Sequence, residues 1–181
     1  MTSIIIIVLV VVLLAWGVGM QNKFVKLDEY CKNALKQINI QQISRYDALK
    51  ALVKLTRDYT SYESETLEKI VNARKITSAP APTVEQVNAN QSALNELAGR
   101  LIAVSERYPE LKANEQYRKT MDSVKEYEEN VRFSRMSFND TVTKYNKQVR
   151  MFPGSLVAGM LGFATREYLA EDAAKTEYPE I

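Results

Sequence analysis

Histidine is absent from the 181-residue sequence, and Cys31 is its one cysteine. Without histidine the chain lacks the commonest general base and the commonest metal ligand of proteins. A single cysteine can form neither an internal disulfide nor a cysteine-based zinc or iron–sulfur site. Glycine and proline are scarce, at 6 and 5 residues, as in chains whose residues lie mainly in helix interiors. These absences favour an all-α protein without a cofactor.

Neither sign of charge is in large excess, because the sequence has 24 Lys and Arg and 22 Asp and Glu. Nucleic-acid-binding proteins usually carry a clear basic excess or stripe, so no nucleic-acid partner is expected. Gly154, Gly159 and Gly162 form no phosphate-binding loop, since they follow a predicted helix and not a strand. We therefore expect no enzymatic activity, no catalytic residues and no metal, and a carboxylate-based enzyme is the least favoured alternative.

One long apolar run is present, from Ile4 to Met20, and no charge appears before Lys23. Its 17 residues would span about 26 Å as a helix, near the short limit for crossing a ~30 Å hydrocarbon core. A cleaved signal peptide is the alternative. It fits less well, because no basic segment precedes the run and no A-x-A-like site follows it. We predict a transmembrane helix over Ile4 to Met20.

The charges beside this run predict its orientation. Basic side chains follow it at Lys23, Lys26, Lys32 and Lys36, whereas none precedes it. The positive-inside rule then predicts an amino terminus outside the cell and a cytoplasmic body. The expected location is the bacterial cell membrane, crossed once.

Apolar spacings of three and four residues predict three long helices, and the first covers about residues 21–77. Its stripe blurs between Asn39 and Asp47, where a kink or break is expected if the helix is not continuous. Pro80 and Pro82 predict the turn that follows. Thr83 and Gln86 then match a capping box that opens a second helix over Val84 to about Tyr108.

The third helix has the most regular pattern. Its apolar seam alternates spacings of four and three residues, interrupted only by Glu128 and Arg135, and a Phe152-Pro153-Gly154 terminator follows. The seam consists of Tyr117, Met121, Val124, Glu128, Val131, Arg135, Phe138, Val142, Tyr145, Val149 and Phe152. Short connections between such helices predict a long antiparallel helical bundle.

The segment from Ser155 to Leu169 holds a further apolar set. It is either a short helix that caps the bundle or a surface that touches lipid or a partner. Only Arg166 is a nearby cation, which argues against lipid. Lipid contact is favoured only if the first helix folds back, because four passes would return this segment to the bilayer.

Several motifs resemble those of the LemA family. They occur in order along nearly the whole chain: Ser44-Arg45-Tyr46-Asp47, Tyr62-Glu63, Thr66-Leu67-Glu68, Ala73-Arg74, Tyr108 to Asn114, Glu128, Arg135, Phe138-Asn139, Tyr145-Asn146, Val149 to Pro153 and Gly162-Phe163. The resemblance implies a four-helix-type antiparallel bundle in a bacterial membrane protein, and it implies no enzymatic activity. LemA-like proteins are often encoded near membrane metalloproteases, which suggests envelope homeostasis by association.

Glu128 and Arg135 stand at core positions of the third helix, seven residues apart. We interpret them as buried paired charges that fix the register of the bundle, with Arg45, Asp47 and Arg74 as candidate partners. The alternative is a ligand or Mg²⁺/Ca²⁺ site, but no loop with the required ligand spacing is present.

The expected organisation is a transmembrane anchor over 1–23, a LemA-like bundle over 24–169 and a flexible acidic tail over 170–181. The expected function is a non-enzymatic scaffold tethered to the lipid bilayer, which assembles into homo-oligomers. The second hypothesis is a regulatory subunit or adaptor of a membrane protease or other envelope protein.

Overall fold

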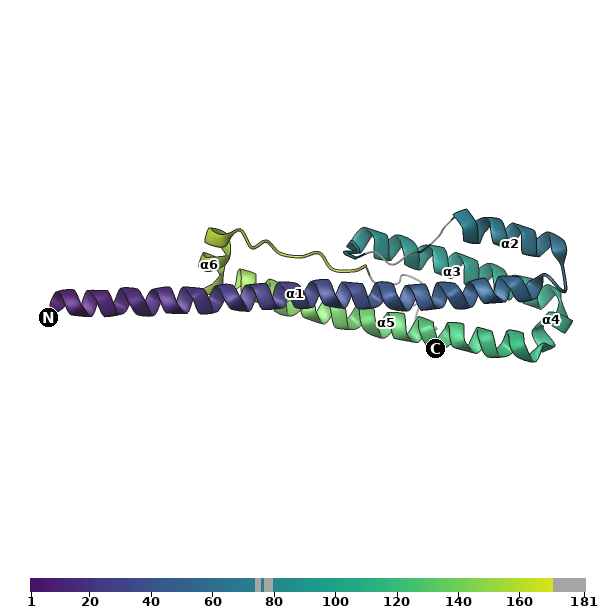
Figure 1. Cartoon of the computed structure of the whole chain (residues 1–181), viewed down its shortest axis with the longest axis horizontal. Coiled ribbons are helices and arrows are strands. Elements are labelled where there is room, and N and C mark those ends of the chain that lie inside the picture. Colours follow the sequence, from purple (N-terminus) through teal and green to yellow (C-terminus); the bar gives the residue numbers. More distant parts are fainter. Residues whose placement is uncertain (74–75, 77–79, 171–181) are drawn as a thin grey trace, which may run out of the picture. The chain divides into compact units, whose positions relative to one another are not determined.

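The computed structural model describes residues 1–73, 76 and 80–170, and this part of the chain is all-α, as predicted (Figure 1). Its helices are α1 (Thr2–Thr56), α2 (Ser61–Ala73), α3 (Val84–Arg107), α4 (Pro109–Ala113), α5 (Glu115–Arg150) and α6 (Gly154–Leu161). Helices α1, α3 and α5 correspond to the three long helices of the sequence pattern, and α6 is the short C-terminal helix.

Helix α1 is one continuous helix of 55 residues, which corresponds to about 82 Å. It contains the Ile4 to Met20 run and passes through residues 39–47 without interruption, so of the two alternatives left open there the continuous helix is the one observed. The apolar stripe blurs in this stretch because Asn39, Gln42 and Arg45 are themselves buried. The interruption reflects a polar core, not a broken helix.

The chain instead reverses between Thr56 and Ser61, within the range predicted as one helix. Thr60 marks the new start, because its Oγ1 accepts a hydrogen bond from the Glu63 amide at 3.4 Å. Helix α2 then packs antiparallel on α1, where the Tyr46 hydroxyl donates to the Val71 carbonyl at 2.9 Å. The fold-back considered from the sequence therefore exists, about ten residues later than expected.

The next helix boundaries follow the sequence signals closely. The capping box is present, with the Gln86 amide donating to Thr83 Oγ1 at 3.1 Å and the Thr83 amide donating to Gln86 Oε1 at 3.0 Å. Helix α3 ends at Arg107, and Pro109 opens the single turn of α4. Every seam position of α5 is buried or partly buried up to Val149, whereas Phe152 is 79% exposed because it lies beyond the end of the helix.

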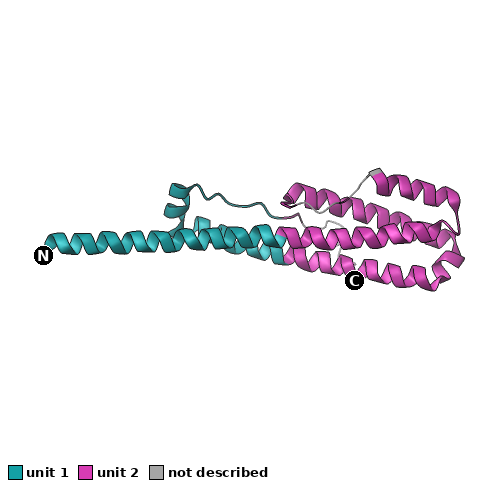
Figure 2. Cartoon of the chain, viewed as in Figure 1, with its two compact units in different colours: residues 1–34, 137–168 teal, residues 35–136, 169–181 magenta. Residues whose placement is uncertain are grey.

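The chain folds into two compact units, and α1 and α5 contribute to both (Figure 2). Unit 2 comprises residues 35–136 and 169–181. Of these, 171–181 lie outside the described residues; they are the predicted tail without its first residue, Ala170. In unit 2, α1, α2, α3 and α5 alternate in direction, as in an up-down-up-down four-helix bundle. Its core includes Leu49, Leu52, Leu67, Val71, Leu94, Leu101, Leu111, Tyr117 and Val124.

Unit 1 comprises residues 1–34 and 137–168. Here the last turns of α5 run antiparallel to α1, and α6 with the segment after it completes the packing (Figure 2). The buried side chains of this unit include Phe24, Cys31, Phe138, Val142 and Tyr145. No described residue covers the first part of α1 in this way, and none of the side chains in its apolar run is buried.

Candidate functional site

Arg45 of α1 is the centre of a polar network inside unit 2. Its side chain is nearly fully buried, and Nη1 donates to Asn95 Oδ1 of α3 at 2.9 Å. Nη2 donates to Glu128 Oε2 of α5 at 3.3 Å. One guanidinium thereby joins three helices, because its planar fork presents several donors at fixed angles.

The structure places Glu128 against Arg45, one of its candidate partners from the sequence. Glu128 itself is less buried than its seam position suggested, with 42% of its side chain exposed. This exposure lowers the cost of desolvating the carboxylate, which is the main penalty of a buried ion pair.

Asp47 and Arg74 were the other two candidate partners. Asp47 is exposed, so it lies outside the buried part of the network. It stands two residues after Arg45, about 200° around the helix, and therefore faces away from the side on which Arg45 is buried. Arg74 lies outside the described residues.

The network also contains Gln42, which the sequence pattern did not single out. This side chain is fully buried on α1, and its Nε2 donates to the Val87 carbonyl at 2.8 Å and to Gln91 Oε1 at 3.5 Å. Its Oε1 has no hydrogen-bond partner among the described residues. The gap in the apolar stripe of α1 was the signal that could have revealed it.

Arg135 occupies the second charged seam position of α5 and is 7% exposed. Its Nη1 donates to Asn88 Oδ1 at 3.3 Å, and its Nη2 donates to the Ala170 carbonyl at 2.5 Å. These partners are an amide and a backbone oxygen on α3 and the C-terminal segment. Arg135 thus joins α5 to α3 and to the segment at Ala170.

The chemistry of this network favours structure over reaction. It holds two guanidiniums, several side-chain amides and one carboxylate, whose Oε2 already accepts from Arg45. In the described ranges, no three His, Cys, Asp or Glu side chains gather where they could hold a metal ion. The arrangement joins α1, α3 and α5 through side-chain hydrogen bonds.

A second polar cluster lies in unit 1 and clamps the segment after α6. The Asn146 side chain of α5 accepts from the Arg166 amide at 2.8 Å and donates to the Arg166 carbonyl at 2.9 Å. The guanidinium of Arg166 bonds Asp28 on α1 through Nε at 2.7 Å and lies 5.9 Å from the Tyr145 ring centroid. We call Asp28, Asn146 and Arg166 the clamp.

Two side chains at this place have shifted pKa values: Asp28, within the clamp, and Cys31, beside it. Partial burial alone would raise the pKa of Asp28, but hydrogen bonds from Lys32 and Arg166 outweigh it and hold that pKa below its usual value. Burial raises the pKa of Cys31, whose thiol has no exposed surface. A buried thiol with a raised pKa is a poor nucleophile.

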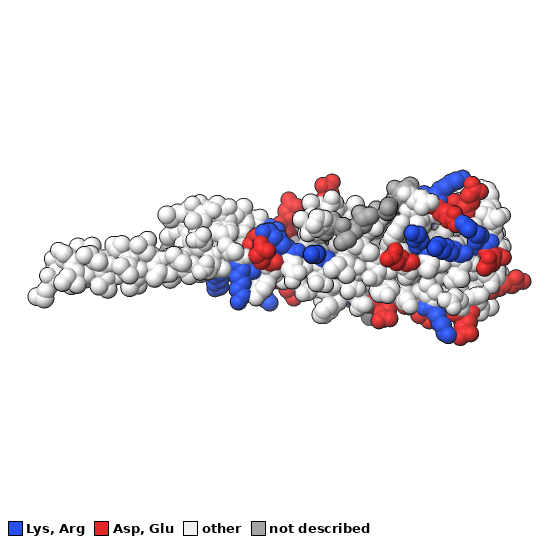
Figure 3. Space-filling model, viewed as in Figure 1, with Lys and Arg blue, Asp and Glu red and all other residues white. Residues whose placement is uncertain are grey.

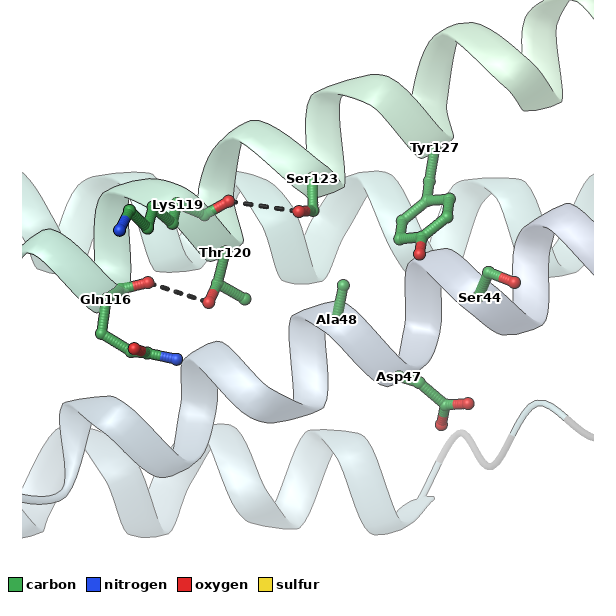
Figure 4. Close-up of a pocket in the computed structure, with 8 residues that line it drawn as sticks. All are labelled: Ser44, Asp47, Ala48, Gln116, Lys119, Thr120, Ser123 and Tyr127. Carbon is green, nitrogen blue, oxygen red and sulfur yellow. Dashed lines mark hydrogen bonds between the residues drawn. The ribbon is translucent and has the colours of Figure 1, made fainter.

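A cavity of about 500 Å³ opens between α1 and α5 in unit 2 (Figure 4). Ser44, Ala48 and Tyr127 are among its lining residues, and Asp47 lies at its edge. The hydroxyls of Thr120 and Ser123 bond carbonyls of their own helix, those of Gln116 and Lys119. Both hydroxyls therefore have hydrogen-bond partners within α5, and neither is arranged as a catalytic base or a metal ligand.

A cavity of about 440 Å³ in unit 1 has a different lining. Lys147 and Arg150 of the last turn of α5 meet Thr143, Met151 and Tyr168 there. The Thr143 hydroxyl donates to the Tyr168 hydroxyl oxygen at 3.4 Å. Hydrogen bonds with Thr143 and Asn146 lower the pKa of Tyr168, and Arg150 and Lys147 add to this effect.

These features define an all-helical bundle protein whose polar residues hold helices together and whose first helix is long and apolar enough to cross a membrane. The sequence model of the LemA family matches residues 34–181. The chain therefore belongs to the LemA family, as its motifs predicted.

Individual relatives match over shorter ranges. Protein LemA of Metamycoplasma hominis is 25% identical over 145 residues, which cover 80% of this chain and 66% of that protein. Magnetosome proteins MamQ 1 and MamQ 2 of Paramagnetospirillum magneticum are each 33% identical over 76 residues, which cover 42% of this chain and 28% of either protein. The chain thus spans just over a quarter of the MamQ relatives it matches.

Proposed function

We propose that this protein is a non-enzymatic scaffold, tethered to the bacterial cell membrane by the first part of α1. The observation that carries the proposal is the continuity of α1, which runs from the charge-free Ile4 to Met20 segment into both compact units without a break. A continuous helix transmits position along its axis more stiffly than a flexible linker does. Family membership supports a role in envelope homeostasis.

The charges after the span support a cytoplasmic bundle. Lys23, Lys26 and Lys32 follow Met20 on α1, and juxtamembrane cations favour the cytoplasmic side. Protease added to intact spheroplasts should leave the bundle uncut. Cleavage of the bundle from outside the cell would contradict this orientation.

Self-assembly is the second element of the proposal. Phe133 and Met136 lie one turn apart on α5, with 73% and 60% of their surface exposed. Neighbouring exposed apolar side chains on a helix are favourable sites for contact with another protein surface. A second copy of this chain is the partner we propose.

Light scattering of the detergent-extracted protein tests this assembly. The wild type should give a multiple of the 20.6 kDa chain mass, and Phe133→Glu combined with Met136→Glu should give a smaller species. Tyr62→Glu, at a site 78% exposed, is the matched control and should leave the mass unchanged. A single chain that co-purifies with a stoichiometric second protein would instead support an adaptor of a membrane protease or other envelope protein.

A further inference from the structure

The corner between α5 and α6 presents apolar side chains that the described residues leave exposed. Residues 151–165 contain no charged residue. Five large apolar side chains in this stretch are 47–87% exposed: Met151, Phe152, Leu156, Met160 and Leu161. We call these five residues the α6 face. Exposed apolar groups of this number in one short segment usually mark a surface that meets something apolar.

Contacts within unit 1 hold the α6 face beside the end of the apolar run. Gln148, near the end of α5, donates to the Met20 sulfur at 3.3 Å. The Phe24 ring stacks on Phe163, just after α6, with ring centroids 5.0 Å apart. Met20 is the last residue of the span, so a bilayer crossed by Ile4 to Met20 would have its interface at the level of these contacts.

Basic side chains of unit 1 lie near the end of the apolar run. Lys147 and Arg150 line the 440 Å³ cavity next to Met151, and neither is in an ion pair within the described part of the chain. Residues 1–34 and 137–168 contain seven Lys and Arg and four Asp and Glu, a net charge of +3. On the side seen in Figure 3, the first part of α1 and the α6 region show no charged side chains, and basic side chains appear next to them together with acidic ones.

We propose that the α6 face enters the bilayer interface beside the transmembrane helix, with Lys147 and Arg150 bound to the headgroups of anionic phospholipids. This inference rests on the proposed membrane tether. The fold makes it reasonable where the sequence pattern argued against it, because Arg166 is occupied by the clamp and α5 supplies the missing cations. An apolar surface with basic residues at its edge is the composition of interfacial membrane segments.

The length of the span supports the same conclusion. Seventeen apolar residues cover about 26 Å, which is shorter than a ~30 Å hydrocarbon core. A short span draws its flanking groups toward the hydrocarbon, and the side chains nearest to it experience this pull first. Leu156 and Met160, one turn apart on α6, are positioned to fill the gap.

Tryptophan quenching by brominated lipids tests the contact in the full chain. Trp16 is the native tryptophan and lies inside the span, so its quenching in vesicles measures the tether alone. Trp16→Phe combined with Phe152→Trp moves the probe to the α6 face. Phe133→Trp in the same background is the control, at a site of similar exposure about 26 Å from Arg150 along the axis of α5.

The proposal predicts quenching of the probe at residue 152 and none at residue 133. Brominated phosphatidylglycerol should quench the residue 152 probe about twofold more than brominated phosphatidylcholine at equal mole fraction. Lys147→Gln with Arg150→Gln should abolish this difference, whereas Arg118→Gln with Lys119→Gln should retain it.

Three results would overturn it. The first is an unquenched probe at residue 152 while Trp16 is quenched, which leaves the tether intact. The second is equal quenching of the residue 152 probe by both lipids. The third is fluorescence of the tryptophan at residue 152 that changes with protein density in the vesicle and not with brominated lipid. This would mean that a second copy of the chain covers the α6 face. Failure of Trp16 quenching would instead contradict the tether itself.

Discussion

Arg166 reaches Oδ1 of Asp28 with both Nε, at 2.7 Å, and Nη2, at 2.5 Å, although 138 positions separate the two residues. This contact joins the segment after α6 to the first helix. Together with Asn146, it determines where the α6 face lies relative to Met20. The clamp is therefore the structural basis of the proposed lipid contact, and its strength can be measured.

Acid should weaken the clamp. The folded pKa of Asp28 is lower than its unfolded value of about 3.9. The stability that this contact contributes is therefore fully present above pH ~4 and is lost as the pH falls through the folded pKa. Asp28→Asn should remove about 1 kcal/mol of unfolding free energy at neutral pH and should flatten this acid limb. Urea unfolding in mild detergent between neutral and acid pH measures both effects.

Asp122→Asn is the control for this experiment, because Asp122 is 73% exposed and, within the described ranges, its ion pair is with Lys125 on its own helix turn. Its unfolding free energy should match that of the wild type. Equal pH profiles for wild type and Asp28→Asn would show that the clamp adds no stability.

Arg45 and Glu128 should be energetically coupled. Glu128→Ala removes the carboxylate from a nearly fully buried guanidinium and should cost about 1–2 kcal/mol, less than a fully buried pair because Glu128 is partly solvated. In a double-mutant cycle with Arg45→Met, the coupling free energy should be about 1 kcal/mol. Glu129→Ala, at a mainly exposed neighbour, should be neutral. A coupling energy of zero would mean that the pair does not fix the bundle.

Cys31 should be inert while the protein is folded. Its thiol is buried and its pKa is raised, so the reactive thiolate is both rare and inaccessible at neutral pH. A maleimide should label it at least about 100-fold more slowly in the native protein than in denaturant. Mass spectrometry of the labelled chain measures the two rates. Rapid labelling of the native protein would show that α1 and α5 separate in unit 1.

The packing of the α5–α6 corner should tolerate a side chain at Gly159 but not at Gly154. A Cβ at Gly154 would lie 2.4 Å from the Gln148 carbonyl oxygen, whereas one at Gly159 meets nothing within 4 Å. Gly154→Ala should therefore destabilise unit 1 by about 1–3 kcal/mol. Gly159→Ala should be neutral or should stabilise α6 by about 0.5–1 kcal/mol. Thermal unfolding followed by circular dichroism distinguishes these expectations, and a Gly154→Ala protein with wild-type stability would contradict the packing of the corner.

The local signals in the sequence predicted the local structure well. Thr83 and Gln86 opened α3 as expected, and the seam of α5 was buried from Tyr117 to Val149. These predictions succeeded because a capping box and a heptad seam depend on residues within a few turns of one helix.

Features that depend on other helices were harder to predict. The blurred apolar stripe around Gln42 looked like a break in the helix. The groups that Gln42 bonds, the Val87 carbonyl and the Gln91 side chain, are 45 and 49 positions away in the sequence. Asp47 belongs to the same motif as Arg45 but faces out, which a motif match cannot reveal. Lys147 and Tyr168 meet at one cavity only after the chain has turned through α6.

Membrane retention of the full chain tests the central claim most directly. Membranes from cells that express it are washed with alkaline carbonate, and the pellet and supernatant are compared for wild type and Leu13→Arg, which places a charge in the middle of the apolar run at a cost of about 3 kcal/mol for insertion. A tethered scaffold predicts that the wild type stays in the pellet and that Leu13→Arg is released in part. Complete release of the wild-type chain would contradict a tether formed by α1.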